Sequence, residues 1–153
     1  MQTPRIEINL EKIAHNAKKL VELYGSKGIS IIGVTKVVCG DPIIAKALVK
    51  SGINILADSR IENIRRMRNA DVKAQFLLLR TPSLSQVEAA VKYADISLNS
   101  ELSVIERLSE CAIDYNKPHK IILMVELGDL REGLMPSYLD DTIKRLLALE
   151  NIE

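Results

Sequence analysis

The sequence predicts an α/β protein in which helices alternate with the strands of one parallel sheet. Five short apolar runs of strand length recur along the 153 residues, and an amphipathic segment follows each of them. Turns rich in glycine, proline, serine and aspartate separate these segments, as expected of βα units. The runs are apolar almost throughout, which is typical of strands covered on both faces. The five predicted strands are 29–35, 53–57, 74–79, 95–98 and 121–127.

The chain before these units predicts a short strand and a helix. Residues 5–9 alternate polar and apolar side chains, which is the period of a strand. Asn9 offers a side-chain oxygen suited to begin a helix. Gly25 and Gly28 end that helix. Its apolar positions form one stripe, made of Leu10, Ile13, Ala14, Ala17, Leu20 and Val21.

Each later helix has its own start signal. Asp41 precedes a proline, which places a cap residue before a proline at the first helical position. Segments 59–62 and 83–86 match the capping box, in which two side chains satisfy free amides of the first turn. Ser100 begins the helix before the fifth strand. The last predicted helix runs over about 137–149.

Two architectures fit this alternation: an open doubly wound sheet, or part of a (β/α)₈ barrel. Neither GxGxxG nor GxxxxGK[ST] follows any predicted strand, so a nucleotide-binding sheet lacks its usual fingerprint. Residues 149–153 could begin a sixth strand, and a whole barrel needs about 250 residues. The prediction is therefore a parallel (β/α) barrel of the TIM type, incomplete, with about its first five strand–helix units in residues 1–153.

Composition excludes several classes of partner. Lys plus Arg (21) nearly cancels Asp plus Glu (20), which argues against a surface for nucleic acid or anionic lipid. No apolar run approaches the roughly 18 residues of a membrane span, and residues 1–5 lack the apolar core of a signal peptide. We therefore expect a cytoplasmic protein with no membrane or nucleic-acid partner. Cys39 and Cys111 form no CxxC, so no metal site is predicted.

Lys36 is the candidate catalytic residue. It ends the first strand of the repeat, and α/β sheets and barrels place their sites at that end. If Lys36 points into the barrel, strand alternation sends Val34, Ile32 and Ser30 inward as well. Desolvation above such an apolar wall favours the neutral amine, which can attack a carbonyl carbon. The alternative is a lysine that extends from a strand end into water.

Three segments give the chain a resemblance to a known family. Residues 6–10 with His15 and Asn16 resemble the opening of the alanine-racemase-like family, whose barrel binds pyridoxal 5'-phosphate (PLP). The resemblance implies that Lys36, in the segment 33–41, carries the cofactor. Segment 126–133 resembles the family's stretch after the fifth strand, where an arginine approaches the cofactor's phenolic oxygen and the substrate carboxylate. Arg131 is the matching residue.

The segment 35–41, Thr-Lys-Val-Val-Cys-Gly-Asp, is most similar to the ornithine-racemase branch. This resemblance implies a PLP-dependent racemase that interconverts L- and D-amino acids through an internal aldimine, with ornithine or another basic amino acid as candidate substrate. It also implies a homo-oligomer, a dimer, because the family's second acid/base is a tyrosine from the β-domain of a partner subunit. That C-terminal β-domain is absent from this chain, so we expect the 153 residues alone to be inactive.

Other functions remain open at this point. A non-catalytic PLP-binding or homeostasis protein shares the barrel, and so do PLP-barrel enzymes of the decarboxylase or D-threonine aldolase type. The sequence that follows Glu153 would discriminate them. A second β-domain with a suitable tyrosine favours the racemase, whereas a barrel that ends near 230–250 residues favours the carrier.

Overall fold

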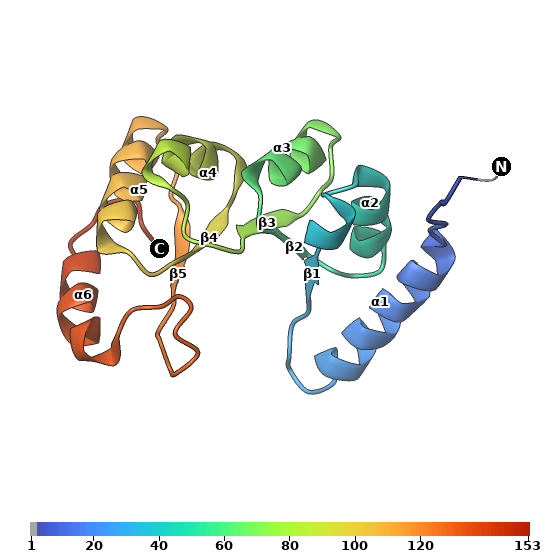
Figure 1. Ribbon diagram of the computed structural model, residues 1–153, viewed down its shortest axis with the longest axis horizontal. Coiled ribbons are helices and arrows are strands. Elements are labelled where there is room, and N and C mark those ends of the chain that lie inside the picture. Colours follow the sequence, from blue (N-terminus) through green and yellow to red (C-terminus); the bar gives the residue numbers. More distant parts are fainter. Residues whose placement is uncertain (1–2) are drawn as a thin grey trace.

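The computed structural model describes residues 3–153 and contains one sheet of five parallel strands (Figure 1). Met1 and Gln2, which the predicted domain range 1–153 includes, lie outside the described residues. Each strand pairs with the next one in the chain, and all four pairings are parallel. The strands are β1 (Ile32–Val34), β2 (Ile55–Asp58), β3 (Gln75–Leu78), β4 (Ile96–Asn99) and β5 (Lys120–Leu123).

The order of the strands decides between the two predicted architectures. A doubly wound sheet reverses its strand order at an inner strand, so two neighbours in the sequence are separated there. The order β1-β2-β3-β4-β5 has no such reversal. It is the order of a (β/α)₈ barrel, and over residues 3–153 the sheet does not close. The predicted fold class, an incomplete parallel barrel with five strand–helix units, is confirmed.

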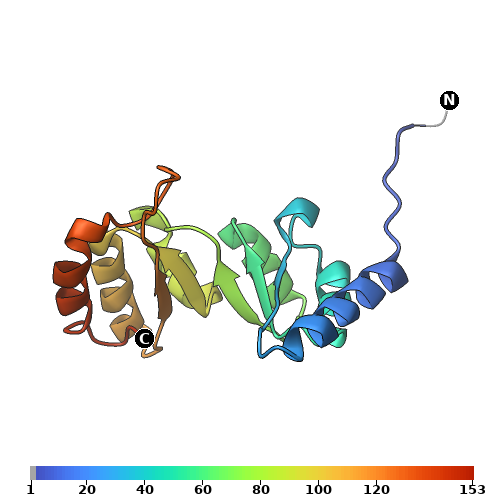
Figure 2. The ribbon, with the colours of Figure 1, turned by 90° about the horizontal axis from the view of Figure 1, so that it is seen from below.

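The helices line one side of the sheet. Helix α1 packs on α2 beyond the β1 edge, and α3, α4 and α5 follow along the sheet (Figures 1 and 2). Helix α6 lies next to α5. Among residues 3–153, no helix is both long enough and apolar enough to cross a membrane. The helices are α1 (Leu10–Gly25), α2 (Pro42–Lys50), α3 (Ile61–Asn69), α4 (Val87–Tyr93), α5 (Leu102–Asp114) and α6 (Leu139–Leu146), with 3₁₀ turns η1 (Lys36–Val38), η2 (Leu84–Gln86) and η3 (Pro136–Tyr138).

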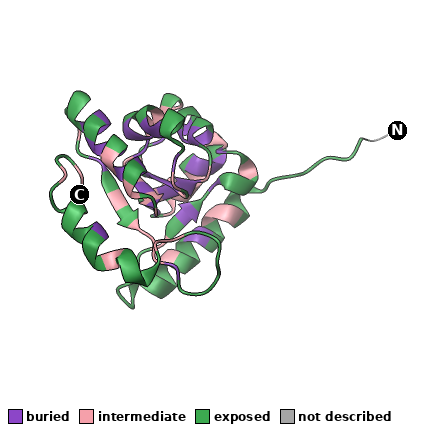
Figure 3. Cartoon of the chain, turned by 60° about the vertical axis from the view of Figure 1, so that its left-hand side comes forward, coloured by how far each residue is buried: buried purple, intermediate pink, exposed green. Residues whose placement is uncertain are grey.

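The core lies between the strands and this helix layer (Figure 3). The side chains of Leu56 and Phe76 fill it from the sheet, and those of Ile64 and Met67 fill it from α3. In β1 the core position is Gly33. A Cβ atom at Gly33 would lie 2.9 Å from Leu56 Cδ2, so only glycine lets β1 approach β2 this closely.

The opposite face of the sheet is open at both of its edges. In β1, Ile32 and Val34 alternate with the core position and are exposed. In β5, Ile122 is exposed in the same way, while Ile121 packs against the core. In a complete barrel, side chains from all the strands fill this inner face.

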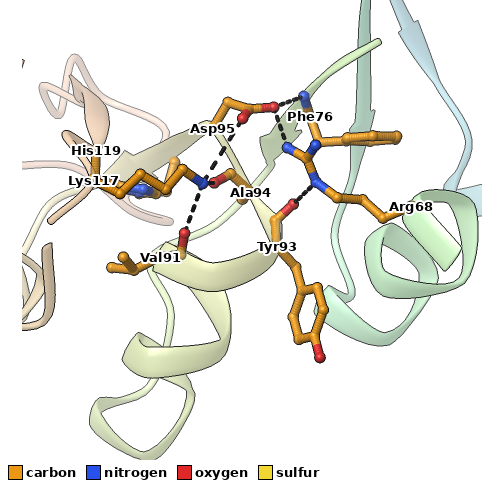
Figure 4. Close-up of polar contacts among 9 residues, drawn as sticks. Arg68, Phe76, Val91, Tyr93, Ala94, Asp95, Lys117 and His119 are labelled. Atoms are coloured by element: carbon orange, nitrogen blue, oxygen red, sulfur yellow. Dashed lines mark hydrogen bonds and ion pairs between the residues drawn. The ribbon is translucent and has the colours of Figure 1, made fainter. Parts of the chain in front are cut away.

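A polar network joins α3, β3 and β4 at the amino ends of the strands (Figure 4). The carboxylate of Asp95 accepts hydrogen bonds from the backbone N–H of Phe76 at 2.7 Å and from Arg68 at 2.5 Å. Arg68 Nε also donates to the Tyr93 carbonyl at 2.6 Å. Lys117 donates to two carbonyls at the end of α4. Burial lowers the pKa of this lysine from its usual value, and the Asp95 carboxylate opposes the shift.

The predicted strand at 5–9 is wrong. Residues 3–9 have no regular secondary structure and are exposed. A strand needs a neighbour to pair its N–H and C=O groups, and within residues 3–153 none lies beside this segment. The predicted helix start is confirmed, because Asn9 Oδ1 accepts the N–H of Lys12 at 2.9 Å.

Both predicted capping boxes are also wrong. Helix α3 begins after Arg60 and has no side-chain cap, so Ser59 lies one residue too early. The N–H of Arg60 donates instead to the Asp58 carboxylate. At the second site, the Ser83 hydroxyl contacts the side chains of Ser85 and Gln86 rather than a free amide.

Two further helix starts lie later than predicted, because Glu101 precedes α5 and the 3₁₀ turn η3 precedes α6. The Asp41 cap of α2 is confirmed by its bonds to the N–H groups of Ile43 and Ile44. The predicted start of a sixth strand is supported by a parallel bridge between Ile152 and His119, beside β5.

Candidate active site at the carboxyl ends of the strands

All five strands end at one edge of the sheet, because they are parallel. Active sites of barrels and of open α/β sheets form at this edge from the loops that follow the strands. The loop after β1 carries Lys36, and the loop after β5 carries Arg131.

Lys36 follows β1 after one residue. Strand β1 ends at Val34, and Thr35 (φ −103°, ψ −1°) has already left the extended conformation. Lys36 is the first residue of the turn η1, and its side chain is exposed. Strand alternation therefore does not determine its direction, and the inward orientation stays a prediction. Two members of the predicted apolar wall, Ile32 and Val34, do share the open face of the sheet, whereas Ser30 lies outside β1.

A buried polar cluster stands directly beside Lys36. Thr35 and Asp58 are fully buried, and Asn63 is nearly so. The Thr35 hydroxyl donates to Asp58 Oδ2 at 2.8 Å, and the Asn63 amide donates to Asp58 Oδ1 at 3.0 Å. The cluster thus ties the ends of β1 and β2 to the first turn of α3.

The loop that carries Arg131 is closed on itself. The N–H of Glu126 donates to the Leu134 carbonyl at 2.9 Å, so the loop leaves and returns at nearly the same point. Inside it, the Glu126 carboxylate accepts the N–H of Gly128. This bond, followed by one from the N–H of Leu130, holds the pKa of the Glu126 carboxyl below its usual range. The Arg131 side chain is exposed.

Lys36 and Arg131 lie at the same edge of the sheet, but in the loops that follow its first and last strands. Within residues 3–153 no hydrogen bond or ion pair joins them, and the sheet does not close. A complete barrel brings the loops after all its strands around one mouth. The arrangement of the five strands is compatible with that geometry.

The cysteines and histidines are the remaining side chains that could bind a metal or carry chemistry. Within residues 3–153, no group of three or more His, Cys, Asp or Glu side chains could hold a metal ion. Both cysteines are free thiols, and Cys111 is buried against the core. His15 is exposed on α1, whereas His119 is buried with its Nε2 atom 2.9 Å from the Ser97 hydroxyl.

Sequence reasoning gave no role to Asp58 or to Glu126, although Glu126 begins the segment 126–133. Each is an acidic residue at or just after the carboxyl end of a predicted strand, which is the signal that could have found it. Each accepts hydrogen bonds near one of the two predicted site residues.

Comparison with solved structures first shows which known proteins share this fold. The alanine racemase of Clostridium difficile 630 superimposes with a TM-score of 0.80 at 22% identity, over 97% of this chain and 42% of that one. PipY of Synechococcus elongatus PCC7942, solved with PLP bound, superimposes with a TM-score of 0.77 at 20% identity, over 90% of this chain and 66% of that one. At these identities the likeness establishes the fold.

The sequence itself establishes the family. Residues 8–153 match the family described as alanine racemase, N-terminal domain, and the chain belongs to that family. A lysine racemase of Thermotoga maritima is 44% identical over 134 residues, which are 88% of this chain and 38% of that protein. An ornithine racemase of Acetoanaerobium sticklandii is 42% identical over 151 residues, which are 98% of this chain and 42% of that protein. The chain therefore spans about two fifths of the length of these relatives.

Proposed function

We propose that this chain is part of a PLP-dependent racemase that interconverts the L and D forms of a basic amino acid, such as lysine or ornithine. The observation that carries the proposal is the 42–44% identity to a lysine and an ornithine racemase, over 88% and 98% of this chain. The likeness to PipY, at 20% identity, concerns the fold and carries no argument about activity.

Lys36 is proposed to hold the cofactor. A primary amine exposed at the active-site edge fits an aldehyde ligand, and the apolar side chains of Ile32 and Val34 on the adjacent open face fit an aromatic ring. When bound, PLP supplies an electron sink that stabilises negative charge at the substrate Cα atom. The Lys36 amine, once free, adds or removes a proton at that atom from one side.

Arg131 is proposed to bind anionic oxygen atoms. Its guanidinium presents several N–H donors in a plane and forms charge-assisted hydrogen bonds with a carboxylate or a phenolate oxygen. Glu126 supports this role by fixing the backbone of the loop from within. The guanidinium of Arg131 would then orient the substrate, and the amine of Lys36 would transfer the proton.

We also propose the setting of this unit. Residues 1–153 would form the N-terminal portion of a PLP-binding (β/α)₈ barrel domain in a cytoplasmic homodimer, with the later strands and a C-terminal β-domain outside this chain. The length of the relatives, of which the chain covers about two fifths, supports this division.

Chemical trapping tests the central assignment. The intact protein is loaded with PLP, reduced with borohydride and digested, and the labelled peptide is mapped. We expect the label on Lys36. We also expect the unreduced protein to racemise lysine or ornithine faster than alanine. Lys46, on α2, serves as an internal reference amine in the same digest. A label on any other lysine would refute the assignment of Lys36.

A further inference from the structure

The backbone from Thr35 to Gly40 forms a closed turn that carries Lys36. The N–H of Gly40 donates to the Thr35 carbonyl at 3.2 Å, and the N–H of Val38 donates to the same oxygen at 3.0 Å. Cys39 and Gly40 both have positive φ, at 51° and 62°. The direction of the Lys36 side chain is therefore set by the shape of this turn rather than by the strand.

Both ends of the turn rest on groups that Asp58 holds. At the first end, Asp58 Oδ2 accepts the Thr35 hydroxyl at 2.8 Å. At the last end, Gly40 lies against Asn63 so closely that a Cβ atom at Gly40 would be 2.7 Å from Asn63 Cβ. Asn63 is itself held by Asp58 Oδ1, through its amide at 3.0 Å. One carboxylate thus connects the two ends of the turn.

The chemistry of this cluster suits a positioning role. Asp58 is fully buried, and its side-chain partners within residues 3–153 are three neutral donors: a hydroxyl, an amide and the N–H of Arg60. A buried carboxylate is costly unless every such bond is made, and apolar residues often stabilise a core as well as a buried charge does. What a carboxylate adds is geometry, because two oxygen atoms collect donors from three separate segments.

From these contacts we infer that Asp58 positions Lys36 by fixing the turn 35–40 at both of its ends. The inference rests on the proposed function, in that Lys36 is taken as the residue that binds PLP. Asp58 touches neither cofactor nor substrate in this account, and acts through Thr35 and Asn63.

The first test compares Asp58→Asn with Asp95→Asn in the intact protein. The Asp58 change turns one acceptor into a donor that faces other donors, whereas the Asp95 change alters a carboxylate at the opposite ends of the strands. In Asp58→Asn, without PLP, we expect faster hydrogen exchange at the amides of Cys39 and Gly40, with unchanged exchange in α5. We expect PLP to attach to Lys36 about 10- to 100-fold more slowly, as misplaced reacting groups do. Asp95→Asn should leave both measurements unchanged.

The second test uses Thr35 and remains available if Asp58→Asn does not fold. Thr35→Val keeps the shape but loses the hydroxyl, and should reproduce the slow attachment. Thr35→Ser keeps the donor and should restore the wild-type rate. If Thr35→Val shows the wild-type rates of hydrogen exchange at Cys39 and Gly40 and of PLP attachment to Lys36, the inference is overturned. A wild-type protein in which PLP does not attach to Lys36 contradicts the proposed function instead, and the exchange measurement still decides the role of Asp58.

Discussion

At the scale of single residues, Arg131 is the candidate most sensitive to a conservative change. A lysine at this position keeps the charge but loses the planar fork of donors that matches a carboxylate. Loss of one bond to a charged group costs about 1.5–3 kcal/mol, so kcat/KM of Arg131→Lys should fall about 10- to 150-fold. Steady-state racemisation of lysine and ornithine by the intact protein measures this. Arg145→Lys, on α6, is the matched control, and unchanged kinetics in Arg131→Lys would place Arg131 outside the site.

His119 gives the molecule a specific acid sensitivity. Burial, with a smaller contribution from the Lys117 ammonium, lowers its pKa from 6.5 to about 4. Between pH 6.5 and about pH 4, His119 is therefore protonated in the unfolded chain but stays neutral in the folded chain. The stability linked to His119 is complete above pH 6.5 and is lost as the pH falls towards 4, by about 3 kcal/mol in total.

Urea unfolding of the intact protein between pH 7.5 and 4 measures this loss. The His119→Gln variant should show a shallower decline in unfolding free energy with acidification than the wild type. The only other histidine in the sequence is His15, exposed on α1, and His15→Gln should follow the wild-type curve. Equal slopes for wild type and His119→Gln would contradict the assignment.

The two site residues could be proposed from sequence because each lies in a motif after a strand end. For Asp58 and Glu126 the sequence offers only the weaker signal of an acidic residue near a strand end, because their roles depend on which N–H and O–H groups the fold brings within 3 Å of their oxygens. Sequence shows an acidic residue at a strand end, and only the packed structure shows that Thr35 and Asn63 meet there.

At the scale of elements, the network around Asp95 joins α3, β3 and β4. Arg68→Ala removes the bonds to Tyr93 and Asp95 and leaves the half-buried Asp95 carboxylate with only the more distant Lys117 ammonium, at 3.9 Å. We expect the unfolding free energy to fall by about 1–3 kcal/mol. Arg65→Ala, at an exposed position of the same helix, should change it by less than about 0.5 kcal/mol. Equal effects of the two substitutions in urea unfolding would show that the network contributes nothing.

The existence and order of the elements were predictable, and their ends were less so. Apolar runs located all five strands, because burial on the helix side requires such runs. The predicted start of α3 was wrong because serine and glutamate at 59–62 match the capping-box pattern. In the structure the helix begins after Arg60, whose N–H donates to the Asp58 carboxylate. The segment 5–9 has the period of a strand, but pairing depends on a neighbour that this sequence pattern does not reveal.

At the scale of the whole molecule, the open face of the sheet tests the proposed barrel. Ile122 in β5 and Ile113 on α5 are equally exposed, each at 45%. If later strands complete a barrel, only Ile122 becomes part of a filled interior. In the intact protein Ile122→Asn should then cost about 2–4 kcal/mol of unfolding free energy, as a buried polar group without partners does. Ile113→Asn should cost less than about 1 kcal/mol. Similar costs at the two positions would contradict the proposed barrel.

The sequential order of the strands also has a consequence for how the molecule is made. Each strand pairs with the strand that follows it in the chain, so every new pairing closes only the short loop of one βα unit. Contacts of low sequence separation form quickly, and domains begin to fold from the amino end while synthesis continues. When β2 leaves the ribosome, β1 has already been synthesised and can pair with it. In the same way, β3, β4 and β5 can each pair with the strand made just before. The nascent chain can therefore extend the sheet one strand at a time during translation. If later strands complete a barrel, the free edge of β1 stays unpaired until the last of them is made.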